Sequence, residues 1–239
     1  MPSGVLVVDV LKFVLLLFSL CVHECAHAWT ASRLGDQTAR EMGRVSLNPM
    51  DHIDPIGTLL FPALMIFGPL FGLTFFGGML IGWAKPTPVL TRNFRKIVRD
   101  DNLTTLAGPF SNLLIVVVAF AVLTVISLVI PDGPQYVYYA FSGRLVSGQG
   151  VSSGVQTAVL LAMWAIIINL SLFFFNLLPI PPLDGSRLLR NALPYNAVQT
   201  YDRIPIWVSY ILMILMGPAL LAILLRPSID IIYFALSRF

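Results

Sequence analysis

Residues 21–29 carry the side chains of this chain that are best suited to metal chemistry. They read Cys-Val-His-Glu-Cys-Ala-His-Ala-Trp and contain His23-Glu24-x-x-His27. Two histidines four residues apart lie on one helical face, one turn apart, so both imidazoles can bind one metal ion. Glu24 lies beside that face, where it can activate a water molecule without binding the metal itself. We therefore predict one Zn²⁺ per chain, with His23 and His27 as ligands and Glu24 as the catalytic base.

The surroundings of the motif favour this interpretation over two buried histidines that neighbouring groups satisfy. An apolar run opens near Val5, and after the motif the next charged residue is Arg33. Ionisable groups at membrane depth are costly and usually serve a function. The motif thus predicts a zinc site inside a membrane.

Composition sets the class of protein. Of the 239 residues, 57% are hydrophobic and 11% charged, and the mean hydropathy is +0.83. These values exclude an ordinary soluble domain. We expect one membrane-embedded domain over 1–239, with a catalytic core at about 5–190 and a C-terminal span and tail at about 204–239.

The apolar runs predict an all-α polytopic membrane protein with about four full transmembrane helices. The expected spans are about 5–34, 103–130, 155–178 and 206–225, the last bent at Gly217-Pro218 and followed by an apolar tail. Residues 56–82 are apolar but broken by many glycines and prolines, so we expect a re-entrant segment there; two short crossings are the alternative. Residues 82–90 should be extended, because Pro86 and Pro88 exclude a central strand but allow a short β edge.

The distribution of charge predicts the orientation. Eleven of the 15 Lys and Arg residues fall in 33–55, 83–102 and 179–203, whereas only Arg144 lies in 131–154. The positive-inside rule makes the three basic loops cytoplasmic. The helices at 5–34 and 155–178 then run in the same direction, and residues 56–82 enter and leave on one side. The active site should therefore lie near the cytoplasmic side of the membrane.

Catalytic zinc takes three protein ligands and keeps one position open, so a third ligand is needed. The candidates are His52, in a polar loop between Asp51 and Asp54, and Asp184, in a proline-rich bend after the 155–178 helix. We favour Asp184, because irregular backbone at membrane depth lines cavities or packs against protein and the topology brings it to the depth of His23. His52 is then left either to assist the substrate or to anchor its loop.

These motifs, in this order, resemble the site-2 protease family of intramembrane zinc metalloproteases. The resemblance rests on His23-Glu24-x-x-His27, Ala107-Gly108-Pro109-x-x-Asn112 and Asn176-x-x-Pro179-x-Pro181-Pro182-Leu183-Asp184-Gly185. The segments Asn48-Pro49-x-x-His52-x-Asp54-Pro55 and Gly82-Trp83-Ala84-Lys85-Pro86 are similar to the compact bacterial branch, and we expect no PDZ or CBS domain. The resemblance implies zinc and hydrolysis of peptide bonds in or next to transmembrane segments.

Two further polar residues lie near helix ends on the side of the motif. Asn112 and Asn176 could donate hydrogen bonds to the substrate backbone or to an oxyanion; hydrogen bonds between helices are the alternative. A protease must also unwind a substrate helix, and an extended enzyme segment can pair with the unwound strand. Residues 82–90 are the predicted segment, a rigid connector being the alternative.

The expected partners are the lipid bilayer and a membrane protein with a transmembrane helix, with no nucleic acid; the oligomeric state is left open. The expected location is the bacterial cell membrane. Two other classes of function have weaker support. A catalytically silent membrane adaptor would not need Glu24 beside two intact ligands, and a metal transporter would carry ionisable residues on several spans.

Overall fold

The computed structural model describes residues 3–72, 85–143 and 152–238. Within these ranges the chain is predominantly helical, in agreement with the predicted all-α class. The helices are α1 (Ser3–Leu34), α2 (Thr38–Glu41), α3 (Phe61–Phe67), α4 (Ile97–Val129), α5 (Gly133–Phe141), α6 (Ser153–Asn176), α7 (Asp184–Ala192), α8 (Tyr195–Tyr201) and α9 (Ile206–Leu236). Shorter helical turns are η1 (Pro49–Asp51), η2 (Pro55–Leu60, a π-helix), η3 (Gly68–Phe71) and η5 (Thr91–Asn93).

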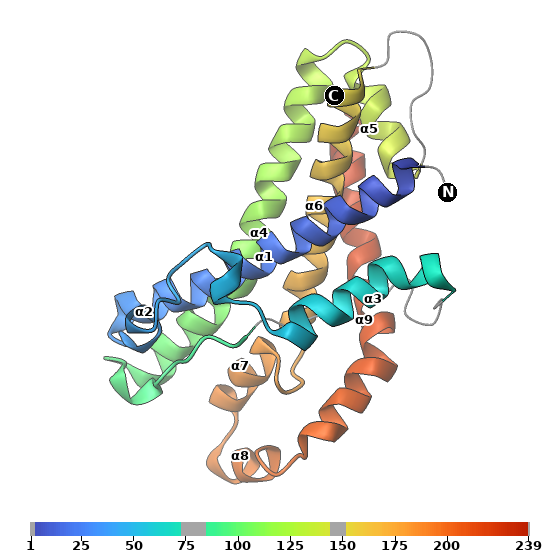
Figure 1. The fold of residues 1–239 in the computed structure, drawn as a ribbon. Coiled ribbons are helices and arrows are strands. Elements are labelled where there is room, and N and C mark those ends of the chain that lie inside the picture. The colour runs from blue at the N-terminus through green and yellow to red at the C-terminus, as the bar shows by residue number, and fades with distance from the viewer. Residues whose placement is uncertain (1–2, 73–84, 144–151, 239) are drawn as a thin grey trace.

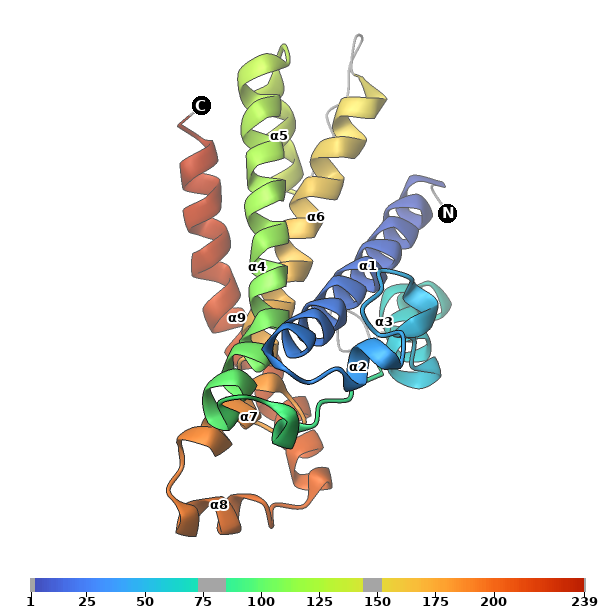
Figure 2. The ribbon, with the colours of Figure 1, turned by 90° about the vertical axis from the view of Figure 1, so that its left-hand side faces the viewer.

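The long helices α1, α4 and α6 form the frame of the molecule (Figure 1). Helix α4 packs extensively against both α1 and α6. Figure 2 shows α4 and α6 side by side with α1 inclined across them, and α1 and α6 run in the same direction, opposite to α4. The expected parallel course of the first and third long helices is therefore found.

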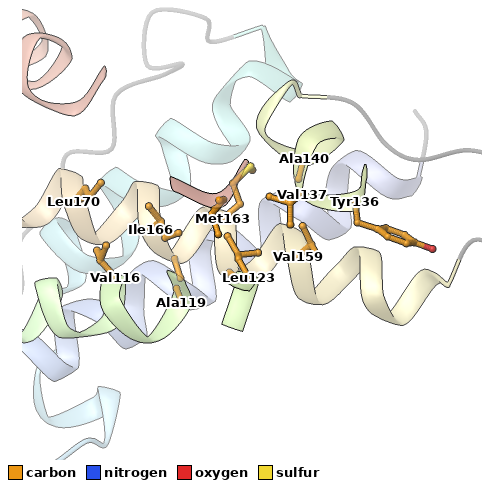
Figure 3. Close-up of a cluster of buried hydrophobic side chains, with 13 residues drawn as sticks. Val116, Ala119, Leu123, Tyr136, Val137, Ala140, Val159, Met163, Ile166 and Leu170 are labelled. Atoms are coloured by element: carbon orange, nitrogen blue, oxygen red, sulfur yellow. The ribbon is translucent and has the colours of Figure 1, made fainter. Parts of the chain in front are cut away.

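A buried apolar cluster fills the space between α4, α5 and α6 (Figure 3). Leu123 of α4 and Ile166 of α6 are both fully buried in it. Burial of such a side chain stabilises a soluble fold by about 1.5–3 kcal/mol, but lipid is itself apolar, so close packing contributes more here. The cluster fixes α6 against α4.

Three described helices, α4, α6 and α9, are long and apolar enough to cross a membrane. Helix α1 is not among them, so three of the four predicted spans are supported by length and composition. Val117, Val118 and Val125 of α4 are more than half exposed, as expected for side chains that face lipid.

One predicted boundary is wrong. The predicted span 206–225 and its tail form one continuous helix, α9, to Leu236, although Pro218 and Pro227 lie within it. Membrane helices tolerate proline, because the backbone groups that proline leaves without a partner can be satisfied by neighbouring groups. The change of direction along α9 is visible in Figure 1. Part of the stretch at 131–154, which lies between two predicted spans, forms α5 and packs on α4 and α6.

The predicted re-entrant segment at 56–82 is described only as far as residue 72, and residues 73–84 lie outside the described ranges. Residues that flank this stretch are adjacent, because the N–H of Lys85 donates to the carbonyl of His52 at 2.9 Å. The stretch therefore leaves and returns at one place, as both a re-entrant segment and two short crossings require. Residues 85–90 are neither helix nor strand, so the β edge stays a prediction.

Candidate metal centre

The two histidines of the motif lie on one face of α1, against α4. Their Nε2 atoms are 3.1 Å apart and both residues are buried. Helix α4 approaches them at Gly108, where a Cβ would lie 2.3 Å from Nε2 of His27 and 2.6 Å from Nε2 of His23. Glycine at this position thus leaves open the space that the two ring nitrogens face.

Asp184 reaches the same point from the first residue of α7. The chain turns back after α6 through Pro179–Pro182, and Gly185 packs directly on the end of α6. A Cβ at Gly185 would lie 2.2 Å from the carbonyl oxygen of Leu177. This close approach fixes the start of α7, and Oδ2 of Asp184 lies 3.1 Å from Nε2 of His23 and 3.3 Å from Nε2 of His27.

The three atoms have the spacing and the chemistry of a metal site. Ligands arranged tetrahedrally around zinc, with bonds of about 2.0–2.1 Å, are separated by about 3.3 Å, close to the three distances seen here. Oδ2 of Asp184 is buried and has no hydrogen-bond partner in the described residues. Three lone pairs that converge without a proton donor repel one another, and a cation at their centre removes that repulsion. The donor set of two imidazoles and one carboxylate fits catalytic zinc.

Contacts from α4 orient both rings. Nδ1 of His27 lies 2.7 Å from the carbonyl oxygen of Thr104, so Nδ1 carries the proton and Nε2 presents its lone pair. Nδ1 of His23 lies 3.1 Å from the amide of Asn112, whose other polar atom has no partner in the described residues. With the amide turned so that its oxygen accepts from Nδ1–H, His23 also presents Nε2 to the metal position.

Glu24 contacts a different part of the chain, Thr87. Its Oε2 accepts hydrogen bonds from the Thr87 N–H at 3.0 Å and from the Thr87 hydroxyl at 2.7 Å. The hydroxyl also lies 3.2 Å from the Glu24 carbonyl oxygen. Thr87 therefore holds one carboxylate oxygen of the motif's acid.

A cavity of about 380 Å³ opens on the three candidate ligands and on Glu24. Polar and apolar side chains line it together, as is usual for a site that must position a polar group. The other lining residues are Leu20, Pro86, Thr87, Val89, Phe175, Asn176, Pro182, Leu183, Arg187, Tyr210 and Met213.

Residues 94–218 match the sequence profile of peptidase family M50. The chain belongs to this family. M50 is the site-2 protease family, so the resemblance drawn from the motifs is confirmed. The matched range contains Asp184 and begins after the His-Glu-x-x-His motif.

Curated relatives are similar over most of the chain. "Putative zinc metalloprotease YwhC" of Bacillus subtilis (strain 168) is 35% identical over 179 residues, which are 75% of this chain and 67% of that protein. "Putative zinc metalloprotease Rip2" of Mycolicibacterium smegmatis is 30% identical over 169 residues, 71% of this chain and 52% of that protein. The matched region thus spans only about half of Rip2. No solved structure shows a significant match.

The other predicted site residues of this M50 protein lie in different places. His52 is buried away from the three candidate ligands, with its Nε2 2.8 Å from the Ser46 carbonyl oxygen, so its position fits the loop-anchoring alternative. Asn176 lines the cavity, and its Nδ2 donates to the Leu172 carbonyl oxygen at 2.9 Å. Asn112 is fully buried beneath His23. That position fits support of a ligand better than contact with a substrate.

Pro86, Thr87 and Val89 line the cavity, but most of the hydrogen-bond donors of residues 85–90 are already used. Lys85 donates to His52, Thr87 to Glu24, and the Leu90 N–H to Oδ2 of Asp36 at 2.7 Å. Proline has no N–H, so three of the four backbone donors in this stretch bind within the protein. A substrate strand would meet mainly carbonyl oxygens here. Residues 85–90 therefore offer few free N–H donors for the predicted strand addition.

Sequence reasoning missed three contributors to the site. Gly108 and Gly185 both stood in motifs, but only the packing shows what their missing Cβ atoms make room for. Thr87 lies in the segment predicted to pair with substrate, and its contact with Glu24 was not foreseen. The one signal for it was its place between Pro86 and Pro88, which holds a residue in an extended conformation.

Proposed function

We propose that this M50 protein is an intramembrane zinc metalloprotease that hydrolyses peptide bonds in or next to transmembrane segments of membrane proteins. The observation that carries the proposal is the convergence of His23, His27 and Asp184, whose ligand atoms lie within 4.8 Å of one another, with Glu24 on the same cavity. Family membership supports it, as do the names of the two relatives, each of which reads "Putative zinc metalloprotease".

The proposed mechanism assigns one role to each group. Zinc held by the two histidines and Asp184 would acidify a water molecule and polarise the scissile carbonyl. Glu24 takes the proton of the attacking water and returns it to the leaving amine. Thr104 and Asn112 hold the two imidazoles, and Asn176 stands at the cavity wall where it can donate to the substrate backbone.

The proposed setting is the bacterial cell membrane, with the centre near its cytoplasmic side. The apolar helices α4, α6 and α9 support the membrane setting. Basic residues of the neighbouring loops support the side, and Arg187 itself lines the cavity. The partner is a substrate with a transmembrane helix, which must be unwound before its peptide bond can reach Glu24.

The decisive experiment compares metal content with hydrolysis. Purified protein should bind one zinc ion per chain and cleave a model transmembrane peptide in detergent or in vesicles. Glu24→Gln should keep the zinc and lose hydrolysis by at least about a hundredfold, because the base is removed and the ligands remain. Asp184→Ala should lose both.

Two results would contradict the proposal. A Glu24→Gln variant that cleaves at the wild-type rate would remove the assigned base. A wild-type protein that binds zinc without cleaving any membrane peptide would instead favour the silent adaptor.

A further inference from the structure

The segment at 85–90 is bound to the rest of the protein at both ends, and its central residue Thr87 binds Glu24 of the catalytic motif. The Lys85 N–H binds the carbonyl of His52, and the Leu90 N–H binds buried Asp36. Between these anchors, Thr87 directs its N–H and its hydroxyl to the same oxygen, Oε2 of Glu24. Sixty-three residues separate the two partners along the chain.

The local sequence makes residues 85–90 rigid. Pro86 and Pro88 fix their own φ angles, and a residue that precedes proline is confined to extended backbone. Lys85 and Thr87 both precede a proline. The direction of the Thr87 N–H is therefore set by the chain itself, and the β-branched side chain has few rotamers in which its hydroxyl can point elsewhere.

The hydrogen bonds from Thr87 determine which carboxylate oxygen of Glu24 can take part in proton transfer. A carboxylate on a rotatable side chain can present either oxygen, and proton transfer needs a positioned one. Two donors on Oε2 stop that rotation. Oε1 is then the oxygen that is left to accept the proton of the attacking water.

We propose that Thr87 is a positioning residue for Glu24: it binds Oε2 through its N–H and hydroxyl and so orients Oε1 for proton transfer. This inference rests on the proposed function. It gives the Pro-Thr-Pro segment a role that differs from both earlier expectations, a rigid connector and a strand that pairs with substrate.

The test compares Thr87→Val with Thr87→Ser. Valine keeps the N–H, the β-branch and the size of threonine but has no hydroxyl, whereas serine keeps both donors. Thr87→Val should lower kcat about tenfold or more, the usual effect of removing a group that orients a catalytic residue. Its KM should stay within about twofold and its zinc at one per chain, since the hydroxyl touches neither substrate nor ligands in this role. Thr87→Ser should restore most of kcat.

A measurement independent of activity tests the contact itself. Melting temperatures of Thr87→Val, Glu24→Ala and the double variant form a cycle. Because either single change removes the hydroxyl–carboxylate bond, the double variant should lose less stability than the sum of the two single losses. Additive losses would show that the bond does not exist in solution.

The remaining outcomes separate this inference from the proposed function. A wild-type kcat in Thr87→Val, a rise in KM alone, or loss of zinc would each overturn the positioning role while hydrolysis by the wild type still stands. Absence of hydrolysis in the wild-type protein would overturn the proposed function, and this inference with it.

Discussion

At the scale of single residues, the absence of one carbon atom shapes the centre. Gly108 of α4 faces the two imidazoles, and a Cβ at this position would lie within 2.6 Å of both Nε2 atoms. Any larger residue would clash with both ring nitrogens. The same residue therefore controls helix packing and metal access.

We expect Gly108→Ala to abolish stoichiometric zinc binding, because a Cβ at 2.3–2.6 Å from both nitrogens forces the rings apart. Zinc content of the purified protein measures it. Gly154→Ala is the matched control, since a Cβ there would meet, among the described residues, only the Ser152 hydroxyl at 3.9 Å. Full zinc in Gly108→Ala would mean that α4 can retreat without loss of the site.

At the scale of elements, α7 must be held against α4 for Asp184 to stay in place. Arg187 of α7 pairs with buried Asp101 of α4. Asn191, one turn further along α7, donates to Oδ2 of Asp101 at 2.7 Å and to Oδ1 of Asn102 at 2.8 Å. Asp101 thus holds α7 against α4 by accepting from both Arg187 and Asn191.

Asp101→Ala should weaken zinc binding about tenfold or more, because Arg187 loses its partner and α7 gains freedom at the ligand. The control is Asp202→Ala, which breaks the exposed ion pair of Arg190 on the same helix. Exposed pairs contribute about 0–1 kcal/mol, so zinc affinity should not change there. Competition with a chromogenic chelator measures both, and equal effects would argue against this role of Asp101.

Asp36 joins the end of α1 to the segment that carries Thr87. Burial by itself would raise its pKa, but hydrogen bonds from Thr38, from the Asn93 amide and from the Leu90 N–H outweigh burial and lower the pKa below its ordinary value. Since the folded protein holds the ionised form more tightly than the unfolded chain does, this stability is complete above about pH 4 and is lost as the pH falls through the lowered pKa.

Asp36→Asn should therefore lower the free energy of unfolding at pH 7 by about 1–3 kcal/mol, and with it the melting temperature. The difference from the wild type should shrink as the pH falls below about 4. Melting curves across this pH range measure both effects. A difference that stays constant with pH would mean that the charge of Asp36 does not contribute.

At the scale of the whole molecule, the candidate centre lies toward one end of the helical frame. Helices α2, α7 and α8 gather at this end, whereas α5 lies at the opposite end (Figure 2). The basic loops surround the former end, which makes it the predicted cytoplasmic side.

Single cysteines at Gln135 and Asn196, both exposed, should report this orientation in a Cys21→Ala, Cys25→Ala background that still binds zinc. A membrane-impermeant maleimide added to intact cells should label Gln135→Cys and leave Asn196→Cys unlabelled until the cells are opened. The reverse pattern would place the centre on the outer side.

The amino-acid sequence alone determined the class of the protein and indicated the residues of the candidate centre. Apolar runs of spanning length, and two histidines one helical turn apart, depend only on local periodicity, which is why α4, α6 and the histidine pair of α1 could be predicted. Charge distribution predicted that α1 and α6 run in the same direction. The choice of Asp184 over His52 followed from topology and matches where the two side chains lie.

Tertiary packing decided the contacts between segments far apart in the chain. Gly108 against the imidazoles and Thr87 against Glu24 each join residues whose contact no local pattern predicts. Asn112 turned toward His23 rather than toward the cavity for the same reason: its place near a helix end was readable, but the face it presents depends on how α4 packs on α1. Periodicity specifies which residues share a helix, and close packing specifies which atoms meet.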